Sequence, residues 1–322
     1  MKDVPVQRPV CVIGLGLIGG SVLRAAARAG RDVFGAADVQ VADPRVEPTV
    51  AAALARAARE DALIVVAVPL PAVDEVLRLV AEHAPSCLLT DVVSVKEPVL
   101  AAVEHRLPGA RFAGGHPMAG RSVSGWEAGA ADLFDGAAWV VTTEEDTPAD
   151  AWRAAVELAL DCGAQVVPTT AREHDAAVAR ISHLPHLLAA VLAATGAEGG
   201  SLALSLAAGS FADGTRVMGT RPELVLAMCE GNRGPLLAAV DEALGRLGAA
   251  RGSLASTGGL AATVRAGHEA RLALEDLRGA DSEEIPVDLT DPEAFETLRD
   301  LGTAGGRVLR LDGDTAIGAL PA

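Results

Sequence analysis

The feature that most constrains the fold is a glycine-rich turn near the N-terminus. It reads Gly14-Leu15-Gly16-Leu17-Ile18-Gly19, follows the apolar run Val10–Ile13 and precedes the amphipathic segment Ser21–Ala29. The apolar run predicts a buried strand, and the amphipathic segment predicts a helix. Between a strand and a helix, the first glycine makes a tight turn. The second lets the backbone approach a pyrophosphate at the positive end of the helix. The turn therefore predicts the first β-α unit of a dinucleotide-binding sheet.

Later apolar runs repeat the alternation of strand and helix. Val33–Gly35 predicts a second strand, and the β-branched run Leu63–Val68, followed by Pro69, has the pattern of a strand buried on both faces. Further strand signals, separated by alanine-rich helical segments, occur at Cys87–Val92, Phe112–Gly115, Ala138–Thr142 and Ala164–Val167. We therefore predict an α/β fold for residues 1–170, with a mostly parallel sheet covered by helices on both faces.

The pattern changes near Ala171. From there to residue 280, helical periods are interrupted at Gly196–Gly200, Gly231–Gly234 and Gly258–Gly259, and strand signals are absent. We predict an all-helical domain for residues 171–280. The tail, residues 281–322, carries ten acidic residues and three arginines, and its role stays open. Its pattern indicates a β-α-β-β unit, with strands at Ile285–Leu289, Arg307–Leu311 and Thr315–Leu320 and a helix at Pro292–Leu301.

Composition argues against two kinds of partner. The chain has a net charge of −16 and no tyrosine, whereas nucleic-acid binding needs a positive field and profits from aromatic stacking. No apolar run approaches the roughly 18 residues that a membrane helix needs, so we expect no membrane segment. The cysteines form no CxxC pair and stand far apart, at Cys11, Cys87, Cys162 and Cys229. We expect buried thiols and a cytoplasmic location.

The cofactor is predicted to lie along the glycine turn and the carboxyl end of the strand that follows at Leu63–Val68. The residues expected to contact it are Gly14, Gly16, Leu17, Ile18, Gly19, Val68 and Pro69. Asp38 comes just after the predicted end of the second strand. An acid there would accept hydrogen bonds from ribose hydroxyls and repel a 2′-phosphate, which favours NAD over NADP. A solvated loop acid is the alternative interpretation of Asp38, and NADP is the alternative cofactor.

Candidate catalytic and binding groups follow two further strands. His116 stands at a strand end in the sequence Gly114-Gly115-His116-Pro117-Met118-Ala119-Gly120. An imidazole with a pKa near ~6.5 suits the acceptance of a hydroxyl proton. Ser94 and Lys96, one of only two lysines, lie just beyond another strand end, where α/β sheets place ligands. The alternative interpretation is a helix start, with Ser94 as its cap and Lys96 in solvent.

Three histidines are close together near the start of the helical region. His183 and His186 are three residues apart and would share a helix face, with Pro185 in the first turn after Ser182. Three interpretations of these two histidines are open: they pack in the core, they bind zinc, or they contact a polar substrate. Zinc is poorly supported, because no cysteine is near and no HExxH arrangement exists, so we predict no metal. His174 is interpreted as structural.

One arginine stands out by its setting. Arg216 follows Asp213-Gly214-Thr215, and a guanidinium is the preferred partner of a carboxylate. An isolated arginine is more often a surface charge, and Arg221 and Arg233 are interpreted in that way.

In this order and spacing, the motifs from about Val10 to Asn232 resemble the prephenate and arogenate dehydrogenase family. The resemblance implies a Rossmann domain, a helical dimerisation domain, a cytoplasmic homodimer and an NAD cofactor. It also implies that His116 is the catalytic histidine, which accepts a hydrogen bond or proton from the ring hydroxyl. Ser94 would assist at that hydroxyl, His186 would bind substrate and Arg216 would hold a carboxylate. We expect substrate contacts from His183 and Lys96 as well.

The implied reaction oxidises and decarboxylates prephenate to 4-hydroxyphenylpyruvate, with hydride transfer to NAD, for tyrosine synthesis. Many family members carry an acid six residues after the motif histidine, where this chain has Ser122, which we include among the substrate-site residues. Because that acid could pair with the ammonium of arogenate, its absence favours prephenate. Many relatives also carry a tryptophan where this chain has Val225. Alternatives are arogenate or 4-amino-4-deoxyprephenate as substrate, or a non-catalytic dinucleotide-sensing protein. The tail lies outside the resemblance.

Overall fold

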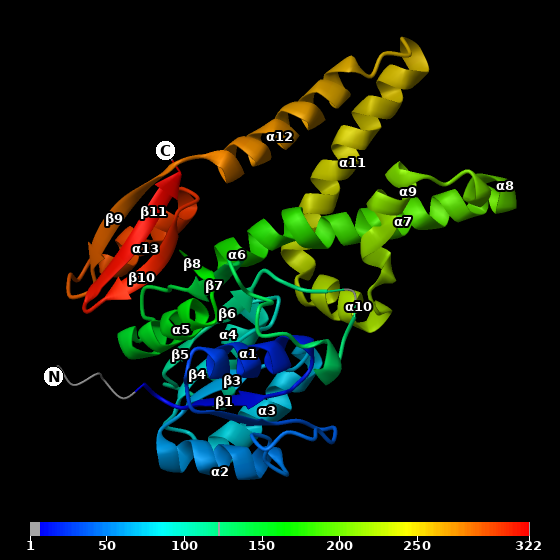
Figure 1. Cartoon of the computed structure of the whole chain (residues 1–322). Coiled ribbons are helices and arrows are strands. Elements are labelled where there is room, and N and C mark those ends of the chain that lie inside the picture. Colours follow the sequence, from blue (N-terminus) through cyan, green and yellow to red (C-terminus); the bar gives the residue numbers. More distant parts are fainter. Residues whose placement is uncertain (1–6, 122, 322) are drawn as a thin grey trace.

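The computed structural model describes residues 7–121 and 123–321 (Figure 1). Its first part is a five-stranded parallel sheet in the order β2-β1-β3-β4-β5. The strands are β1 (Val10–Ile13), β2 (Val33–Ala36), β3 (Leu63–Val66), β4 (Leu88–Asp91) and β5 (Phe112–Ala113). Their residues are buried throughout, which explains the continuous apolar runs in the sequence.

Helices cover both faces of this sheet, as predicted. They are α1 (Leu17–Arg28), α2 (Val50–Glu60), α3 (Leu70–His83), α4 (Glu97–Arg106) and α5 (Ala149–Asp161). Alternate residues of β1 enter two separate cores. Val10 and Val12 pack with residues of α1 and α5, whereas Cys11 and Ile13 pack with residues of α2, α3 and α4. The carboxyl ends of the strands stay open for a ligand.

The strands from Gly115 onward form a second sheet. It has six strands in the order β6-β7-β8-β10-β11-β9, and only β7 and β8 pair in parallel. Its first strands are β6 (Gly115–Pro117), β7 (Ala138–Thr142) and β8 (Gln165–Thr169), and the loop between β6 and β7 holds the short helix η1 (Trp126–Ala128). The chain changes sheets at Gly114, whose N–H donates to Thr142 Oγ1 at 2.7 Å. A Cβ on Gly115 would lie 2.5 Å from the backbone oxygen of Asp91, so only glycine fits there.

The tail has the predicted β-α-β-β order, with β9 (Ser282–Asp288), α13 (Ala294–Thr303), β10 (Arg307–Asp312) and β11 (Thr315–Pro321). It completes the second sheet, because β10 pairs with β8 through Val308 and Val166. Leu298 and Leu301 of α13 join the core that contains Trp152 of α5. Strand patterns alone do not reveal such a distant pairing partner.

The middle region is helical in its described residues, as predicted. Its elements are α6 (Ala171–Val178), the π-helical turn η2 (Ala179–His183), α7 (Leu184–Glu198), α8 (Gly200–Ser205), α9 (Gly209–Thr215), η3 (Arg216–Gly219), α10 (Pro222–Gly231), α11 (Arg233–Ser256) and α12 (Ala261–Gly279). In Figure 1, α11 runs away from the sheets and α12 returns to the tail. α12 has no buried residue.

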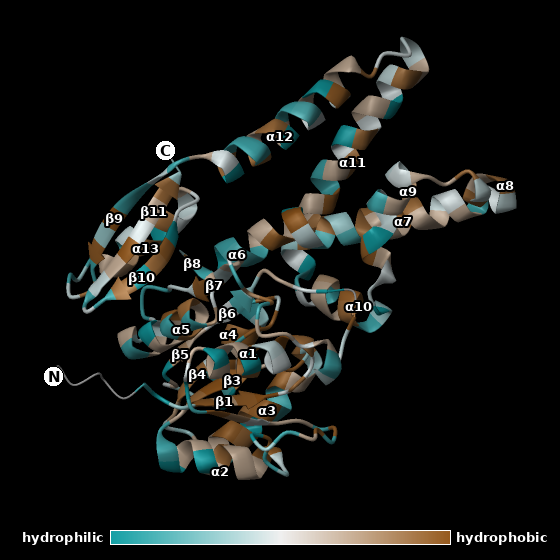
Figure 2. Ribbon diagram, in the orientation of Figure 1, coloured by the Kyte–Doolittle hydropathy of each residue, from teal (hydrophilic) through white to brown (hydrophobic). Residues whose placement is uncertain are grey.

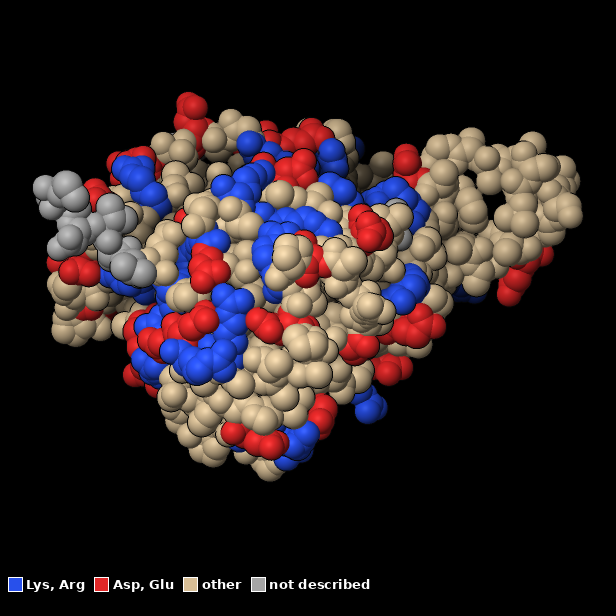
Figure 3. Space-filling model, turned by 60° about the horizontal axis from the view of Figure 1, so that its bottom comes forward, with Lys and Arg blue, Asp and Glu red and all other residues tan. Residues whose placement is uncertain are grey.

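Apolar and polar residues alternate along these helices (Figure 2). Exposed large apolar side chains include Ile181, Leu188, Val191, Leu192, Leu202 and Leu206. The protruding end, at the right of Figure 3, carries few charged side chains, whereas acids and bases are interspersed over the rest of that face. Exposed apolar patches of this extent mark a surface that another molecule covers.

One helix is longer and more apolar than the sequence analysis expected. The continuous helix Ala171–Glu198 has 28 residues and a mean hydropathy of 1.4 in its most apolar window, so its length and composition would allow it to cross a membrane. The π-helical turn keeps this helix unbroken through the histidines and Pro185, where the sequence suggested a start or bend. The same helix carries Ile181, Leu188 and Val191 of the exposed apolar surface.

Candidate active site

A cleft of about 340 Å³ lies at the carboxyl ends of the parallel strands. The glycine turn contributes Gly16, Leu17 and Ile18, and the strand ends contribute Val68, Pro69 and Ser94. His116 lines the same cleft, and α10 closes it with Arg221, Leu224 and Met228. The structure thus brings together seven residues that the sequence predicted for the cofactor and the chemistry.

The glycine turn fits a dinucleotide. Gly14 has φ +98°, and a Cβ there would lie 2.5 Å from the Ala67 oxygen. A Cβ on Gly19 would lie 1.9 Å from the Gly14 oxygen, so both glycines allow close packing of strand and helix. Gly16 faces open space and precedes α1, whose first turn has neither a side-chain cap nor an acid. The backbone N–H groups in the first turn of α1 therefore have no side-chain partner, and they are suited to bind a pyrophosphate.

Asp38 lies two residues beyond the end of β2, at the edge of the sheet where an adenosine ribose would lie. Its side chain is exposed, and it is not among the residues that line the cleft. The role of Asp38 stays a prediction.

Lys96 corrects one of our assignments. Its side chain is 1% exposed, forms an ion pair with Asp91 and donates to the Gly115 oxygen at 2.7 Å. Asp91 also accepts from the N–H groups of Val93, at 2.8 Å, and Gly115, at 3.1 Å. Because its ammonium is enclosed by these partners, Lys96 holds Gly115, and with it the start of β6, instead of contacting a substrate. A compact ammonium suits this enclosed position better than a planar guanidinium.

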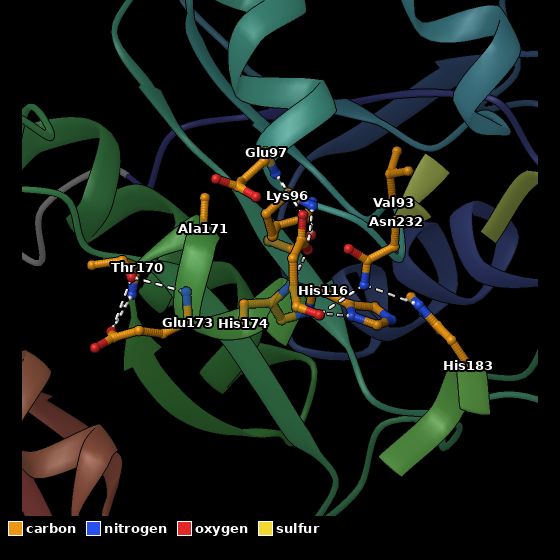
Figure 4. Close-up of polar contacts among 12 residues, drawn as sticks. Val93, Lys96, Glu97, His116, Thr170, Ala171, Glu173, His174, His183 and Asn232 are labelled. Carbon is orange, nitrogen blue, oxygen red and sulfur yellow. Dashed lines mark hydrogen bonds and ion pairs between the residues drawn. The ribbon is translucent and has the colours of Figure 1, made fainter. Parts of the chain in front are cut away.

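His116 is hydrogen-bonded to a second histidine (Figure 4). Its Nδ1 lies 2.8 Å from His174 Nε2, and His174 Nδ1 lies 2.7 Å from Asp175 Oδ1. Asp175 in turn accepts from the backbone N–H groups of Lys96, at 2.8 Å, and Glu97, at 2.9 Å, at the start of α4. The interpretation of His174 as merely structural therefore misses its contact with His116. The adjacent aspartate was the available signal.

The charge on Asp175 sets the direction of these hydrogen bonds. Burial raises the pKa of Asp175, but hydrogen bonds from His174 and from the backbone of Glu97 and Lys96 outweigh it and lower this pKa below its ordinary value. Asp175 therefore only accepts, so His174 donates from Nδ1 and accepts at Nε2. His116 then donates from Nδ1, which leaves its Nε2 unprotonated for the cleft. Burial, and then the nearby His174, lower the pKa of His116 well below its ordinary value, so its ring is neutral.

In His183 the proton is on the other ring nitrogen, Nε2. The amide of Asn232 donates to the Asp175 backbone oxygen at 2.7 Å and to His183 Nδ1 at 3.0 Å. His183 therefore carries its proton on Nε2, which is buried and has no hydrogen-bond partner among the described residues. Burial lowers the pKa of His183 to about 4, so the ring is neutral. An unpaired buried donor costs about 1–3 kcal/mol, and a polar ligand would relieve that cost. The sequence analysis did not identify Asn232.

Other predicted residues lie outside the cleft. His186 is half-buried in the first turn of α7, where its Nδ1 donates to the Ser182 oxygen at 2.8 Å. Arg216 is exposed on η3 and does not line the cleft in a single chain. Instead, the cleft includes Arg121 and Arg221, and we had interpreted Arg221 as a surface charge. Ser122 lies outside the described residues. In the described part of the chain, no group of three histidine, cysteine, aspartate or glutamate side chains is arranged to hold a metal.

Comparisons with known proteins show the family of this chain. The family model of the prephenate dehydrogenase nucleotide-binding domain matches residues 33–168, and that of the prephenate dehydrogenase dimerization domain matches residues 170–257. Cyclohexadienyl dehydrogenase of Zymomonas mobilis is 30% identical over 288 residues, which are 84% of this chain and 97% of that protein. The chain belongs to the prephenate dehydrogenase family.

Two further members of the prephenate dehydrogenase family extend the comparison. The prephenate dehydrogenase of Bacillus subtilis is 30% identical over 263 residues, which are 75% of this chain and 67% of that protein. The solved structure of a candidate prephenate dehydrogenase from Corynebacterium glutamicum is 43% identical, with a TM-score of 0.86, and covers 94% of this chain and 98% of that chain. Because 94% coverage leaves fewer residues unmatched than the tail contains, that relative shares at least part of the tail. The family makes this chain a dehydrogenase with a nucleotide-binding domain.

Proposed function

We propose that this protein is an NAD-dependent prephenate dehydrogenase, which converts prephenate to 4-hydroxyphenylpyruvate and carbon dioxide in tyrosine synthesis. The observation that carries the proposal is that His116 lines one cleft with the glycine turn, while its Nδ1 is hydrogen-bonded to His174. Free cysteines, Cys11, Cys87, Cys162 and Cys229, support a cytoplasmic location.

The side chains of the cleft have distinct tasks in this reaction. His116 accepts the proton of the ring hydroxyl, and Ser94 lies in the same cleft to hydrogen-bond that oxygen. NAD, when bound at the glycine turn, accepts the hydride from the ring carbon. His183 does not line the cleft, but its unpaired Nε2–H is available to a polar substrate atom that reaches it. Holding substrate and cofactor in one geometry then contributes much of the rate.

The charge of the cleft supports prephenate over arogenate. Arg121 and Arg221 line it, and none of the described residues that line it is acidic. Prephenate carries two carboxylates and no amine, whereas arogenate carries an ammonium that needs an acidic partner. Ser122 supplies no such partner by its chemistry. A cationic cleft therefore favours the dianionic keto acid.

A homodimer is part of the proposal. The dimerization family model covers α6 to α11, which carry the exposed apolar side chains described above. A partner subunit would cover them, and it would also bury part of the long apolar helix Ala171–Glu198. Arg216 and His186 belong to the same helical region, so the dimer is the state in which their predicted substrate contacts must be tested.

One assay tests the proposed function. The purified protein is mixed with NAD or NADP and with prephenate, arogenate or 4-amino-4-deoxyprephenate, and the absorbance of reduced nicotinamide is followed. We expect turnover with NAD and prephenate. Preference for either amino compound would reassign the substrate, and dinucleotide binding without any turnover would favour the sensing protein.

A further inference from the structure

We propose that His174 and Asp175 form a proton relay behind His116. In this relay the hydroxyl proton of the substrate enters His116 at Nε2, and the proton on His116 Nδ1 moves to His174 Nε2, beside the carboxylate of Asp175. This inference rests on the proposed function and adds the place where the proton is held during the reaction.

Hydrogen bonds connect the cleft to Asp175 through His116 and His174. His116 lines the cleft, its Nδ1 lies 2.8 Å from His174 Nε2, and His174 Nδ1 lies 2.7 Å from Asp175 Oδ1. His174 and Asp175 are 2% and 1% exposed, so little of either side chain is in contact with solvent. The path crosses from β6 to α6 and ends at the positive N-terminus of α4, which fixes the carboxylate through two N–H groups.

The surrounding charges favour His174 over His116 as the site of the positive charge. The ammonium of Lys96 is paired with Asp91, and the fixed tautomer of His183 is neutral. Glu173 lies next to His174 on α6. Its carboxylate accepts a hydrogen bond from the Thr170 hydroxyl at 2.9 Å. Asp175 is therefore the anion that contacts His174. In contrast, the charged side chains that share the cleft with His116 are arginines. An imidazolium is stabilised beside a carboxylate and destabilised near cations.

The relay is needed because the substrate oxygen first loses a proton and later takes it back. The ring carbon loses a hydride and the hydroxyl loses its proton, so the oxygen becomes a carbonyl. The ring carboxylate then leaves as carbon dioxide, and its bonding electrons make the ring aromatic and the oxygen a phenolate. That oxygen takes the proton back from His116 Nε2, while His174 Nε2 returns its proton to His116 Nδ1. No proton is released overall, so the relay holds one proton between the two steps.

His174→Gln separates holding a proton from merely orienting the ring. A glutamine oxygen can accept from His116 Nδ1–H and keep the ring in place, but it cannot take up a proton. We expect kcat to fall about 100-fold, with the KM for prephenate and the Kd for NAD unchanged. Val178→Ala is the matched control, because Val178 is 2% exposed and lies one turn further along α6. Wild-type kcat in His174→Gln would overturn the relay.

His174→Ala with added imidazole is the complementary test. A cavity of about 390 Å³ borders His174, Ala177 and Val178, which gives a small imidazole access to the vacated position. We expect imidazole to raise kcat at least about tenfold, with weaker rescue by less basic imidazoles. Failure of imidazole to raise kcat would contradict proton storage at this position.

A measurement without turnover completes the test. ¹⁵N NMR of labelled histidines in the resting protein should show His116 and His174 each protonated at Nδ1 alone, and Asp175→Asn should disturb the pattern of His174. A resting His174 protonated at Nε2 would overturn the proposal. If no substrate is turned over, the proposed function fails while this measurement still reports on the relay. Prephenate oxidation without the predicted tautomers would remove the relay alone.

Discussion

Two histidines bonded around Asp175 carry their protons on opposite ring nitrogens, and of the two only His116 lines the cleft. His116 presents an unprotonated Nε2, whereas His183 presents an Nε2–H. Asp175 fixes both positions, the first through its carboxylate and His174, the second through its backbone oxygen and Asn232. A proton acceptor and a proton donor thus depend on one residue.

His116→Asn should separate binding from chemistry. Asparagine cannot take the hydroxyl proton, so we expect kcat with prephenate to fall by about 10²- to 10⁴-fold. The Kd for NAD, measured by isothermal titration, should stay unchanged, because the glycine turn is intact. Turnover that survives this substitution would place the proton acceptor elsewhere.

The pH dependence of activity follows from the lowered pKa of His116. Only the neutral ring accepts a proton, and it predominates above that pKa. Because burial lowers the pKa well below 6.5, kcat/KM for prephenate should stay level as the pH falls through 6.5 and decline only at lower pH. Circular dichroism over the same range controls for unfolding. An acid limb centred at or above the ordinary histidine pKa would contradict a buried neutral His116.

Two arginines compete for the role of carboxylate partner. Loss of a hydrogen bond to a charged group costs about 1.5–3 kcal/mol, so Arg221→Ala should raise the KM for prephenate about 10- to 100-fold. Arg216→Ala tests the prediction made from sequence, and Arg233→Ala is the exposed control. An unchanged KM in Arg216→Ala would remove that assignment, and an unchanged KM in Arg221→Ala would remove the one made from the cleft.

Sequence reasoning located residues whose roles depend on a strand end. The glycine turn, Ser94 and His116 each follow a buried strand, and carboxyl ends of parallel strands meet in space. Lys96 and Asn232 were not assigned correctly. Asp91 is only five residues from Lys96, but a strand end does not show that the ammonium turns back to it and to Gly115. For Asn232, the contact with Asp175 spans 57 residues.

At the scale of elements, the passage from β5 to β6 positions His116. The parallel sheet ends at Ala113, and Gly114 and Gly115 carry the chain into the second sheet past Asp91. Phe112–Gly115 predicted one strand, whereas the structure divides this run between β5 and β6, because a strand signal does not say which sheet it joins. The same lack of partner information explains why the pairing of β8 with β10 was not foreseen.

Lys96→Met should destabilise this passage. It leaves the Asp91 carboxylate buried without its cation, and breaking a buried ion pair costs about 3–5 kcal/mol. Urea unfolding should show this decrease in the free energy of unfolding. Asp91→Asn in the same chain should restore part of it, and Arg78→Ala, at an exposed ion pair on α3, should have little effect. An unchanged free energy of unfolding in Lys96→Met would contradict the role of Lys96 in holding Gly115 in place.

For the whole molecule, we expect the exposed apolar side chains of the helical region to form the dimer interface. Val191 on α7 is 57% exposed in a single chain. We expect the wild-type protein to sediment as a dimer and Val191→Glu to shift it toward the monomer, because a buried charge is costly at an interface. Arg59→Glu, on the exposed face of α2, should leave the dimer intact. A monomeric wild-type protein would contradict the homodimer.

The pairing of Val308 with Val166 has a consequence for the rest of the chain. Deleting the acidic tail would leave β8 as a bare sheet edge and uncover Trp152, which now contacts Phe295 of α13. An unprotected edge with open hydrogen-bonding groups can template β-aggregation. We therefore expect a protein without the tail to precipitate, whether or not the tail also has a regulatory role.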